Sequence, residues 1–359
     1  MTESWCAFVK RRNGEKLRRW LIKNGLLDTG VKVQSENDWL IFPLKRELNE
    51  EEESELIQSL ENIRFERRSI ELNVIKKPKD LFSALGNSIP EKLHEFIPRS
   101  FDTVGDIVII EIPEEIIEFE RLIGKTILDM HPSLISVFKK TEPITGEFRL
   151  RNVELLAGIN KTETIYRENK CKFELDIKKV YFSPRLVTEH ARVCSLVKKS
   201  EKVLDMFTGI GPFSILIAKQ KQAQIYAVDI NPDAIYYLKK NIVLNKVENF
   251  ISPLEGDIRE VINQISEQRF DRIIMNLPSK ASEFLDVALK VLNSEGVIHF
   301  YEFVSESDFP EKSLSNLRSK IEQNDRVINE ILQIRKVRPY APYIWHVGID
   351  FTVQPSDYL

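Results

Sequence analysis

Two glycines follow an acidic residue in the stretch VLDMFTGIGPFSILIAK, residues 203–219. Asp205 ends an apolar run that predicts a strand, and Gly209 and Gly211 come just before an apolar pattern that predicts a helix. Glycines at such a strand-to-helix turn allow the backbone to approach a ligand closely at the carboxyl edge of a sheet. By itself, this turn is compatible with NAD, FAD or S-adenosylmethionine (SAM).

Further acidic residues follow the next strands. Asp229 ends the second predicted strand, about 20 residues on, where a carboxylate accepts hydrogen bonds from ribose hydroxyls. Asp257, in EGDIRE after the third strand, is placed to meet the exocyclic amine of an adenine. Each acid alone could be a helix cap. Three acids at successive strand ends instead favour a ligand that contains adenosine.

Three features favour SAM over a dinucleotide. The NAD motif requires a third glycine where this chain has Ser214. Pro212 removes a backbone N–H that could bind a pyrophosphate, a group that SAM lacks. Asn276-Leu277-Pro278, after a fourth apolar strand, offers a rigid carbonyl and an amide to the edge of a planar nitrogen base. The sequence therefore predicts a SAM site beside a nucleobase.

The pattern from Val180 onward predicts the elements that position these residues. Strands are expected at 202–206, 224–230, 273–276 and 296–303, and helices from Pro184 and at 212–219, 232–245 and 281–292. Repeated strand–helix units predict a mostly parallel sheet with helices on both faces. Strands at 334–337 and 346–353, joined by the PYAPY turn, predict an antiparallel edge. This α/β arrangement is that of a class I (Rossmann-like) methyltransferase domain with seven strands, here at 177–359.

Two smaller domains are expected before it. Residues 1–62 predict an α/β unit with a helix at 15–24, the strand Trp39–Pro43 and a charged linker. Seven basic residues and one acid lie between Lys10 and Lys23, although the net charge of the chain is −3. Residues 63–176 predict an α+β domain from one helix pattern, starting at Glu114, and several short strands.

The composition excludes several other classes. No apolar run approaches the roughly 20 residues that cross a bilayer, and the charged N-terminus lacks the apolar core of a signal peptide. Three scattered cysteines without CxxC spacing and five unpaired histidines argue against a disulfide framework and a metal site. We expect a cytoplasmic protein without a metal or a membrane association.

A family resemblance rests on motifs spread over the catalytic half and part of the middle domain. The chain strongly resembles the archaeal and eukaryotic tRNA (guanine(37)-N(1))-methyltransferases. The motifs are GEFRLRNVELLAG, VYFSPRLVTEHAR, DMFTGIGPFSI, YAVDINPDAI, IIMNLPSKASEFLDVAL, GVIHFY and YAPYIWHVGIDF. The resemblance implies methyl transfer from SAM to N1 of guanosine 37 in tRNA, next to the anticodon, by a monomeric enzyme.

The resemblance also implies roles for individual residues. Glu189 is the general base at guanine N1, and Arg149 reaches O6, where negative charge develops. Tyr181 packs against the base, and Asn276 and Pro278 shape the guanine pocket. Arg149 and Arg151 are expected on one strand face, so the residue that reaches O6 could be Arg151, two positions along, instead of Arg149. The SAM site is expected to comprise Asp205, Phe207, Gly209, Gly211, Asp229, Ile230, Asp257, Ile258 and Asn276.

The N-terminal domain is expected to recognise tRNA outside the anticodon, at the elbow, and the middle domain the anticodon stem-loop. The nearest alternative is the related transferase that moves the aminocarboxypropyl group of SAM in wybutosine synthesis. Additional methylation of a wyosine intermediate and a non-catalytic tRNA-binding protein also stay open. A uracil-5-methyltransferase is disfavoured because no cysteine lies near Asn276.

Overall fold

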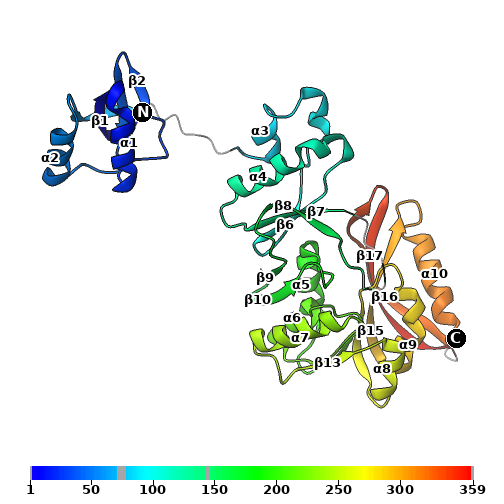
Figure 1. Ribbon diagram of the computed structural model, residues 1–359. Helices are drawn as coiled ribbons and strands as arrows, with labels where there is room; N and C mark the ends of the chain where they lie inside the picture. Colours follow the sequence, from blue (N-terminus) through cyan, green and yellow to red (C-terminus); the bar gives the residue numbers. More distant parts are fainter. Residues whose placement is uncertain (1, 71–77, 142–145, 147, 357–359) are drawn as a thin grey trace. The chain divides into compact units, whose positions relative to one another are not determined.

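The computed structural model describes residues 2–70, 78–141, 146 and 148–356, which form two compact units (Figure 1). The first unit is Met1–Lys79 and the second is Asp80–Leu359. Each unit encloses hydrophobic clusters of its own.

The first unit is an antiparallel sheet with two helices. Its strands, in the order β2-β3-β1-β4, are β1 (Thr2–Lys10), β2 (Gln34–Glu36), β3 (Trp39–Pro43) and β4 (Arg64–Ile70). The helices are α1 (Gly14–Lys23) and α2 (Glu50–Ser59). Because β4 pairs with β1 from Thr2↔Ile70 to Phe8↔Arg64, the predicted boundary after residue 62 is too early. A strand after that boundary completes the N-terminal sheet.

The charged segment at 44–62, expected to be helical or a linker, contains α2, and its acidic run forms the first turn of that helix. Asn49 caps this helix by accepting a hydrogen bond from the Glu52 backbone amide (2.8 Å), and the Glu52 carboxylate accepts one from the Asn49 amide (2.9 Å). Negative charges at a helix N-terminus complement the helix dipole. The run of glutamates therefore begins a helix.

The second unit starts with a four-stranded sheet in the order β5-β6-β7-β8. The strands are β5 (Asp102–Val104), β6 (Ile107–Ile110), β7 (Ser136–Lys140) and β8 (Val153–Gly158). The α-helices beside them are α3 (Leu81–Leu85) and α4 (Glu120–Met130), accompanied by the 3₁₀ turns η2 (Glu91–Phe96) and η3 (Glu114–Phe119). The expected α+β character of this region is present.

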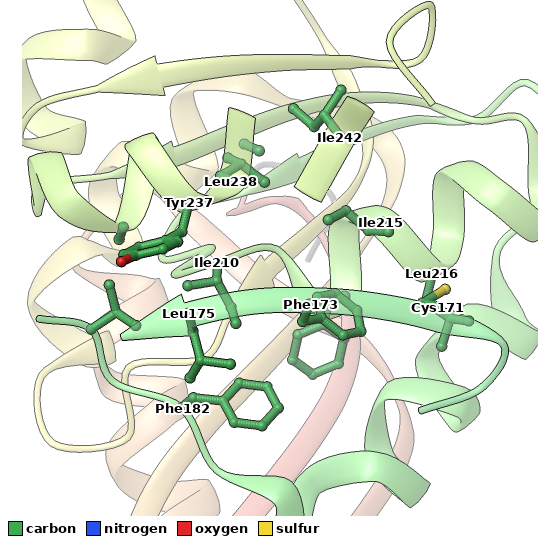
Figure 2. Close-up of a cluster of buried hydrophobic side chains, with 14 of the residues drawn as sticks. Cys171, Phe173, Leu175, Phe182, Ile210, Ile215, Leu216, Tyr237, Leu238 and Ile242 are labelled. Carbon is green, nitrogen blue, oxygen red and sulfur yellow. The ribbon is translucent and has the colours of Figure 1, made fainter. Parts of the chain in front are cut away.

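A hairpin of β9 (Glu163–Glu168) and β10 (Cys171–Asp176) follows and packs on the helices of the next sheet. Figure 2 shows side chains of β10, such as Phe173 and Leu175, beside Ile215 of α6 (Pro212–Lys221) and Leu238 of α7 (Pro232–Asn245). The backbone amide of Glu174 also donates to Asn241 of α7 (2.7 Å). The predicted boundary after residue 176 therefore separates a hairpin from the core that it helps to build.

The large sheet has seven strands in the order β13-β12-β11-β14-β15-β17-β16. They are β11 (Lys202–Asp205), β12 (Gln224–Asp229), β13 (Ile251–Glu255), β14 (Phe270–Met275), β15 (Leu292–Ser305), β16 (Arg326–Ala341) and β17 (Ile344–Pro355). The first five strands pair in parallel, whereas β17 is antiparallel to both β15 and β16. The predicted class I fold with an antiparallel edge is confirmed.

Helices cover both faces of this sheet (Figure 1). One layer contains α5 (Val187–Leu196), α6 (Pro212–Lys221) and α7 (Pro232–Asn245), and the other contains α8 (Ile258–Gln264), α9 (Leu285–Val291) and α10 (Glu311–Glu322). Successive residues of β11 point to opposite layers, so Val203 packs with the first and Leu204 with the second. The sequence interpretation did not include α8 or α10, and it made β16 much too short.

No helix in the described part of the chain is long and apolar enough to cross a membrane. The three cysteines are free and buried. Within residues 2–70, 78–141, 146 and 148–356, no group of three or more His, Cys, Asp or Glu side chains is placed to hold a metal.

Candidate cofactor and nucleobase site

One pocket at the carboxyl edge of the large sheet brings together most of the residues singled out in the sequence. The predicted site residues that line it are Arg149, Tyr181, Phe207, Gly209, Asp229, Ile230, Asp257, Ile258, Asn276 and Pro278. Asp205, Gly211 and Glu189 are not among its lining residues.

Close packing requires a glycine at position 211 in this turn. Gly211 is the N-cap of α6 and has a φ of 91°, in the left-handed region that favours glycine. A Cβ atom there would lie 2.5 Å from Leu238 Cδ1. The turn therefore fits tightly against α7 and leaves the backbone of Gly209 exposed to the pocket.

Asp205 supports this turn from below. It is fully buried, and its carboxylate accepts a hydrogen bond from Ser214 Oγ (2.8 Å). Burial raises the pKa of Asp205 to about 6, although the hydroxyls of Ser214 and Thr208 act in the opposite direction. Ser214, which replaces the third glycine of the NAD motif, thus anchors the strand end instead of making room for a phosphate.

Asp229 and Asp257 present carboxylates at neighbouring strand ends. Asp229 accepts hydrogen bonds from the backbone amides of Gly209 (2.7 Å) and Asn231 (2.9 Å), while burial raises its pKa. Each of its oxygens retains a lone pair, because a carboxylate accepts about four hydrogen bonds. Asp257 caps α8 by accepting from the Arg259 amide (2.8 Å). The helix-cap role is thus real for Asp257 and coexists with its place in the pocket.

Apolar side chains flank these acids. Ile230 and Ile258 line the pocket directly after Asp229 and Asp257, and Phe207 contacts Phe284 with ring centroids 5.1 Å apart. Apolar walls beside carboxylates suit an adenosine, whose flat base and ribose hydroxyls need both. The residues on this side of the pocket fit SAM.

Arg149 and Tyr181 form the opposite side. The guanidinium carbon of Arg149 lies 5.1 Å from the centre of the Tyr181 ring, and Arg149 has a φ of 54° in a turn. Arg151 is buried and pairs with Asp102 of β5 (3.6 Å). The expectation that both arginines share a strand face is wrong, because this segment turns. Arg149 is the one that reaches the pocket.

Asn276 and Pro278 connect the two sides. Asn276 Oδ1 is buried and has no hydrogen-bond partner among the described residues. The Pro278 carbonyl accepts a hydrogen bond from the backbone amide of Phe303 on β15 (3.2 Å). The motif is therefore fixed to the sheet and presents an unsatisfied acceptor to the pocket.

Glu189, in the first turn of α5, lies in a buried ion cluster. Its carboxylate accepts hydrogen bonds from Tyr301 Oη (2.5 Å), from Arg192 (2.9 Å) and from Arg335, which bonds to both carboxylate oxygens. Arg192 also donates to Asp350 (2.6 Å). Both oxygens of Glu189 are therefore bonded within the protein.

This cluster determines the charge of Glu189. Burial alone would raise the pKa of the Glu189 carboxyl, but the hydrogen bond from Arg192 and the positive charge of Arg335 outweigh it and lower the pKa. The Tyr301 hydroxyl has a pKa raised well above its usual value by burial and by Glu189, so it stays a donor. Glu189 is accordingly an ionised carboxylate held by charged neighbours.

Cross-strand register explains the position of this cluster. Tyr301, Gly348 and Arg335 are neighbours on β15, β17 and β16, and the next row contains Phe303, His346 and Arg338. The first row holds Glu189, and the second row lines the pocket. None of the site residues predicted from the sequence lies in either row, although GVIHFY contains Tyr301, the strand at 334–337 contains Arg335, and YAPYIWHVGIDF contains His346 and Gly348. The alternation of apolar residues along β17 was the available signal.

The chain matches known protein families along most of its length. Residues 164–328 match the TRM5/TYW2 methyltransferase domain, residues 81–162 the TYW2 N-terminal domain, and residues 6–53 the tRNA methyltransferase 5 N-terminal domain. The middle match ends just before β9, consistent with the hairpin belonging to the large sheet's core.

Individual relatives cover nearly the whole chain. It is 41% identical over 345 residues to tRNA (guanine(37)-N(1))-methyltransferase Trm5b of Pyrococcus abyssi, covering 96% of this chain and 98% of that protein. The solved complex of aTrm5 and tRNALeu is 38% identical, with a TM-score of 0.70, covering 97% of this chain and 99% of that one. A Methanocaldococcus jannaschii tRNA(Phe) (4-demethylwyosine(37)-C(7)) aminocarboxypropyltransferase is 36% identical over 254 residues, covering 70% of this chain and 96% of that protein.

Proposed function

This chain belongs to the TRM5 family of tRNA methyltransferases, and from that premise we propose that it transfers the methyl group of SAM to N1 of guanosine 37 in tRNA. The carrying observation is that a single pocket joins residues suited to adenosine with residues suited to a nucleobase. One chain supplies both sides, so the enzyme acts as a monomer. Its buried free cysteines suit the reducing cytoplasm, where we place it.

Residues of the first side would hold SAM. Asp229 binds the ribose hydroxyls with its remaining lone pairs, Asp257 accepts from the adenine amine, and Ile230 and Ile258 flank the adenine. SAM supplies, when bound, an electrophilic methyl group on a sulfonium. Asp205 and Gly211 act by shaping the turn, and neither touches the ligand.

Residues of the second side would act on guanine. Tyr181 packs against the base, and Arg149 donates hydrogen bonds to O6, where negative charge develops as the N1 proton leaves. Asn276 Oδ1 accepts from an N–H group of the base edge. Glu189 takes the N1 proton as general base.

For Glu189 to take that proton, one of its arginine hydrogen bonds must be exchanged for the guanine N1–H. Arg335 is the candidate to withdraw, because its edge strand β16 lies at the margin of the sheet. Both arginines also pair with Asp350 on β17, but Arg192 is held more closely (2.6 Å) than Arg335 (3.6 Å). This exchange would link the proton affinity of Glu189 to the binding of the nucleobase.

The test uses unmodified tRNA with guanosine 37 and SAM labelled in its methyl group. Wild-type protein should produce labelled 1-methylguanosine at position 37, and Glu189→Gln should lower the single-turnover rate by about 100-fold or more. Glu302→Gln, on β15 and away from the pocket lining, serves as the control and should retain the rate. A Glu189→Gln enzyme with the wild-type rate would exclude Glu189 as the base.

The related aminocarboxypropyl transfer is the second candidate, because 36% identity to such an enzyme extends over 254 residues. SAM labelled in its aminocarboxypropyl carbons separates the two. Label entering tRNA only from these carbons would assign the chain to that reaction. Label entering from the methyl group of SAM alone supports methyl transfer.

The first unit would bind tRNA away from the anticodon. Its helix α1 carries exposed basic residues, including Lys16, Arg18 and Arg19. Part of this charge is already paired, since Arg19 contacts Glu15 (3.0 Å). Phosphate contacts from the remainder would add affinity that falls steeply with salt. The middle sheet would in turn hold the anticodon stem-loop.

A further inference from the structure

A second buried carboxylate lies beside the Glu189 cluster. Asp350 of β17 is 2% exposed, and its partners across the sheet are His299 of β15 and Gln333 of β16. This row lies two residues along each strand from the row that holds Glu189, so both rows present side chains to the same face of the sheet. The two carboxylates therefore lie under one helix, α5, and both bond to its Arg192.

A buried histidine fixes one oxygen of Asp350. His299 Nε2 lies 2.7 Å from Arg272 Nη1, and because an arginine can only donate, Nε2 is the acceptor. The proton of a neutral ring is then on Nδ1, which donates to Asp350 Oδ1 (2.7 Å). Burial lowers the pKa of His299, in keeping with a neutral ring. Asp350 is thus oriented by a neutral donor, which leaves its negative charge for the arginines.

The hydrogen bonds of Asp350 leave one position open. Oδ1 accepts from His299 and from Arg192 Nη2 (3.3 Å), while Oδ2 accepts from Arg192 Nη1 (2.6 Å). Burial alone would raise the pKa of Asp350, but the hydrogen bonds from His299 and Arg192 outweigh it and lower the pKa. An ionised carboxylate accepts about four hydrogen bonds, two at each oxygen. Oδ2 can therefore accept one more.

Arg335 presents a donor to this open position. Its Nη1 lies 3.6 Å from Asp350 Oδ2, which makes an ion pair but is too long for a hydrogen bond. The same nitrogen donates to Gln333 Oε1 (3.4 Å), whereas Nε and Nη2 donate to Glu189. A guanidinium released from Glu189 would thus need only a short movement to bond to a second carboxylate.

The other destinations for this guanidinium are less favourable. Gln333 is neutral and exposed, so it cannot balance the charge of an arginine. Leaving a partly buried charge without any partner is strongly destabilising. We propose that Asp350 accepts the Arg335 guanidinium when the guanine N1–H replaces it on Glu189. Asp350 is then a positioning residue for the base, an assignment that rests on the function proposed above.

Substitutions test this exchange in single-turnover methyl transfer to guanosine 37, at saturating SAM and tRNA. Asp350→Asn should lower the rate by about ten-fold or more, because the amide offers no negative charge to the displaced arginine. Arg335→Met in the same chain should restore the rate to that of Arg335→Met alone, because no guanidinium then needs a destination. Asp271→Asn removes a carboxylate of β14 that accepts from Asn293 (2.6 Å), and it should keep the wild-type rate.

A merely structural role of Asp350 predicts a different result. If Asp350 only supported Arg192 or the sheet, removing Arg335 as well would deepen the loss of rate, and that outcome would overturn the proposal. A wild-type rate in Asp350→Asn would overturn it too. The same holds if Gln333→Met loses the rate while Asp350→Asn keeps it, since Gln333 would then be the acceptor.

A crystal structure decides the question if Asp350→Asn does not unfold cooperatively. It would contain wild-type protein, tRNA with guanosine 37, and sinefungin, a SAM analogue without a transferable methyl group. Arg335 Nη1 should lie within about 3.2 Å of Asp350 Oδ2 and away from Glu189. An Arg335 that still bonds to Glu189 while guanine occupies the pocket would exclude the exchange. Absence of methyl transfer to guanosine 37 by the wild type would instead refute the proposed function itself.

Discussion

Glu189 owes its charge state to two arginines that come from different elements. Arg192 lies one turn further along α5, and Arg335 comes from β16. A base with a lowered pKa stays ionised throughout the neutral range, but it is a weak proton acceptor while both arginines remain. Under the proposed mechanism, catalysis by Glu189 thus depends on how far Arg335 withdraws.

Arg335→Met should raise the pKa of Glu189, because it removes a positive charge from a buried carboxylate. The acid-side inflection of the single-turnover rate should therefore move to higher pH, by about one unit or more. Rates measured between pH 4.5 and 8.5 at saturating SAM and tRNA check this. Lys336→Met is the matched control. Lys336 follows Arg335 on β16 but pairs with the exposed Glu306 (2.8 Å), so its loss should leave the inflection in place.

The pKa of Asp205 is raised, whereas that of Glu189 is lowered, and this rise makes the free energy of unfolding depend on pH. Its pKa is about 6 in the folded protein and about 3.9 in an unfolded chain, so the folded state binds more protons between these values. The stability associated with Asp205 is complete below pH 4 and is lost as the pH rises through 6, by about 3 kcal/mol in all. Urea unfolding of wild type and Asp205→Asn from pH 4 to 8 should show this loss in the wild type alone. If the free energy of unfolding changed with pH in the same way in both proteins, this role of Asp205 would be contradicted.

Three adjacent strands, β15, β17 and β16, position Tyr301 and Arg335, the side chains of the sheet that bond to Glu189 of α5. Gly348 is central to them: a Cβ atom there would lie 2.9 Å from Arg335 Nη2 and 3.2 Å from Tyr301 Cε1. The Arg335 guanidinium crosses over this glycine to reach Glu189 from the far strand. The sheet thus brings an edge residue to a helix two strands away.

Gly348→Ala should displace the end of Arg335, which is the more flexible of the two neighbours. We expect the same upward move of the acid-side inflection as in Arg335→Met. The double variant should show no further change, because both substitutions act through one contact. An additive double variant would show that Gly348 acts through another group, for which Tyr301 is the neighbour to examine.

The sequence predicted the elements whose signals are local. The glycine turn, Asp229 and Asp257 each follow a short apolar strand, and the α-helix α7 was predicted with its observed bounds. The cluster around Glu189 could not be predicted this way, because its hydrogen bond to Arg335 spans 146 positions. The length of β16 was also missed, since its irregular register and half-buried pattern hide the alternation of a strand.

At the scale of the whole molecule, the domain boundaries in the structure differ from those that composition suggested. The charged segment at 44–62, helical or linker-like by its composition, suggested a boundary near its end, yet the chain continues through β4 before the first unit is complete. Similarly, β9 and β10 continue into the core of the large sheet. In both cases, strands outside the range predicted for a domain help to build its core, and composition carries no trace of this.

Truncations test this division. A chain that begins at Asp80 should stay folded and bind SAM, because the second unit contains its own clusters. Its affinity for tRNA should fall by about ten-fold or more, with a shallower dependence on salt between 50 and 200 mM. A chain that begins at residue 63 should aggregate instead, since β4 would lack its partner β1. Unchanged tRNA affinity of the shorter chain would remove the binding role of the first unit.

The absence of a side chain at Gly348 also constrains how this enzyme can diverge. Any replacement there moves Arg335 away from Glu189, and a smaller residue at 335 leaves the carboxylate with a different basicity even if the glycine is kept. A substitution at either position is therefore expected to change the basicity of Glu189, so the glycine and the arginine act as one unit.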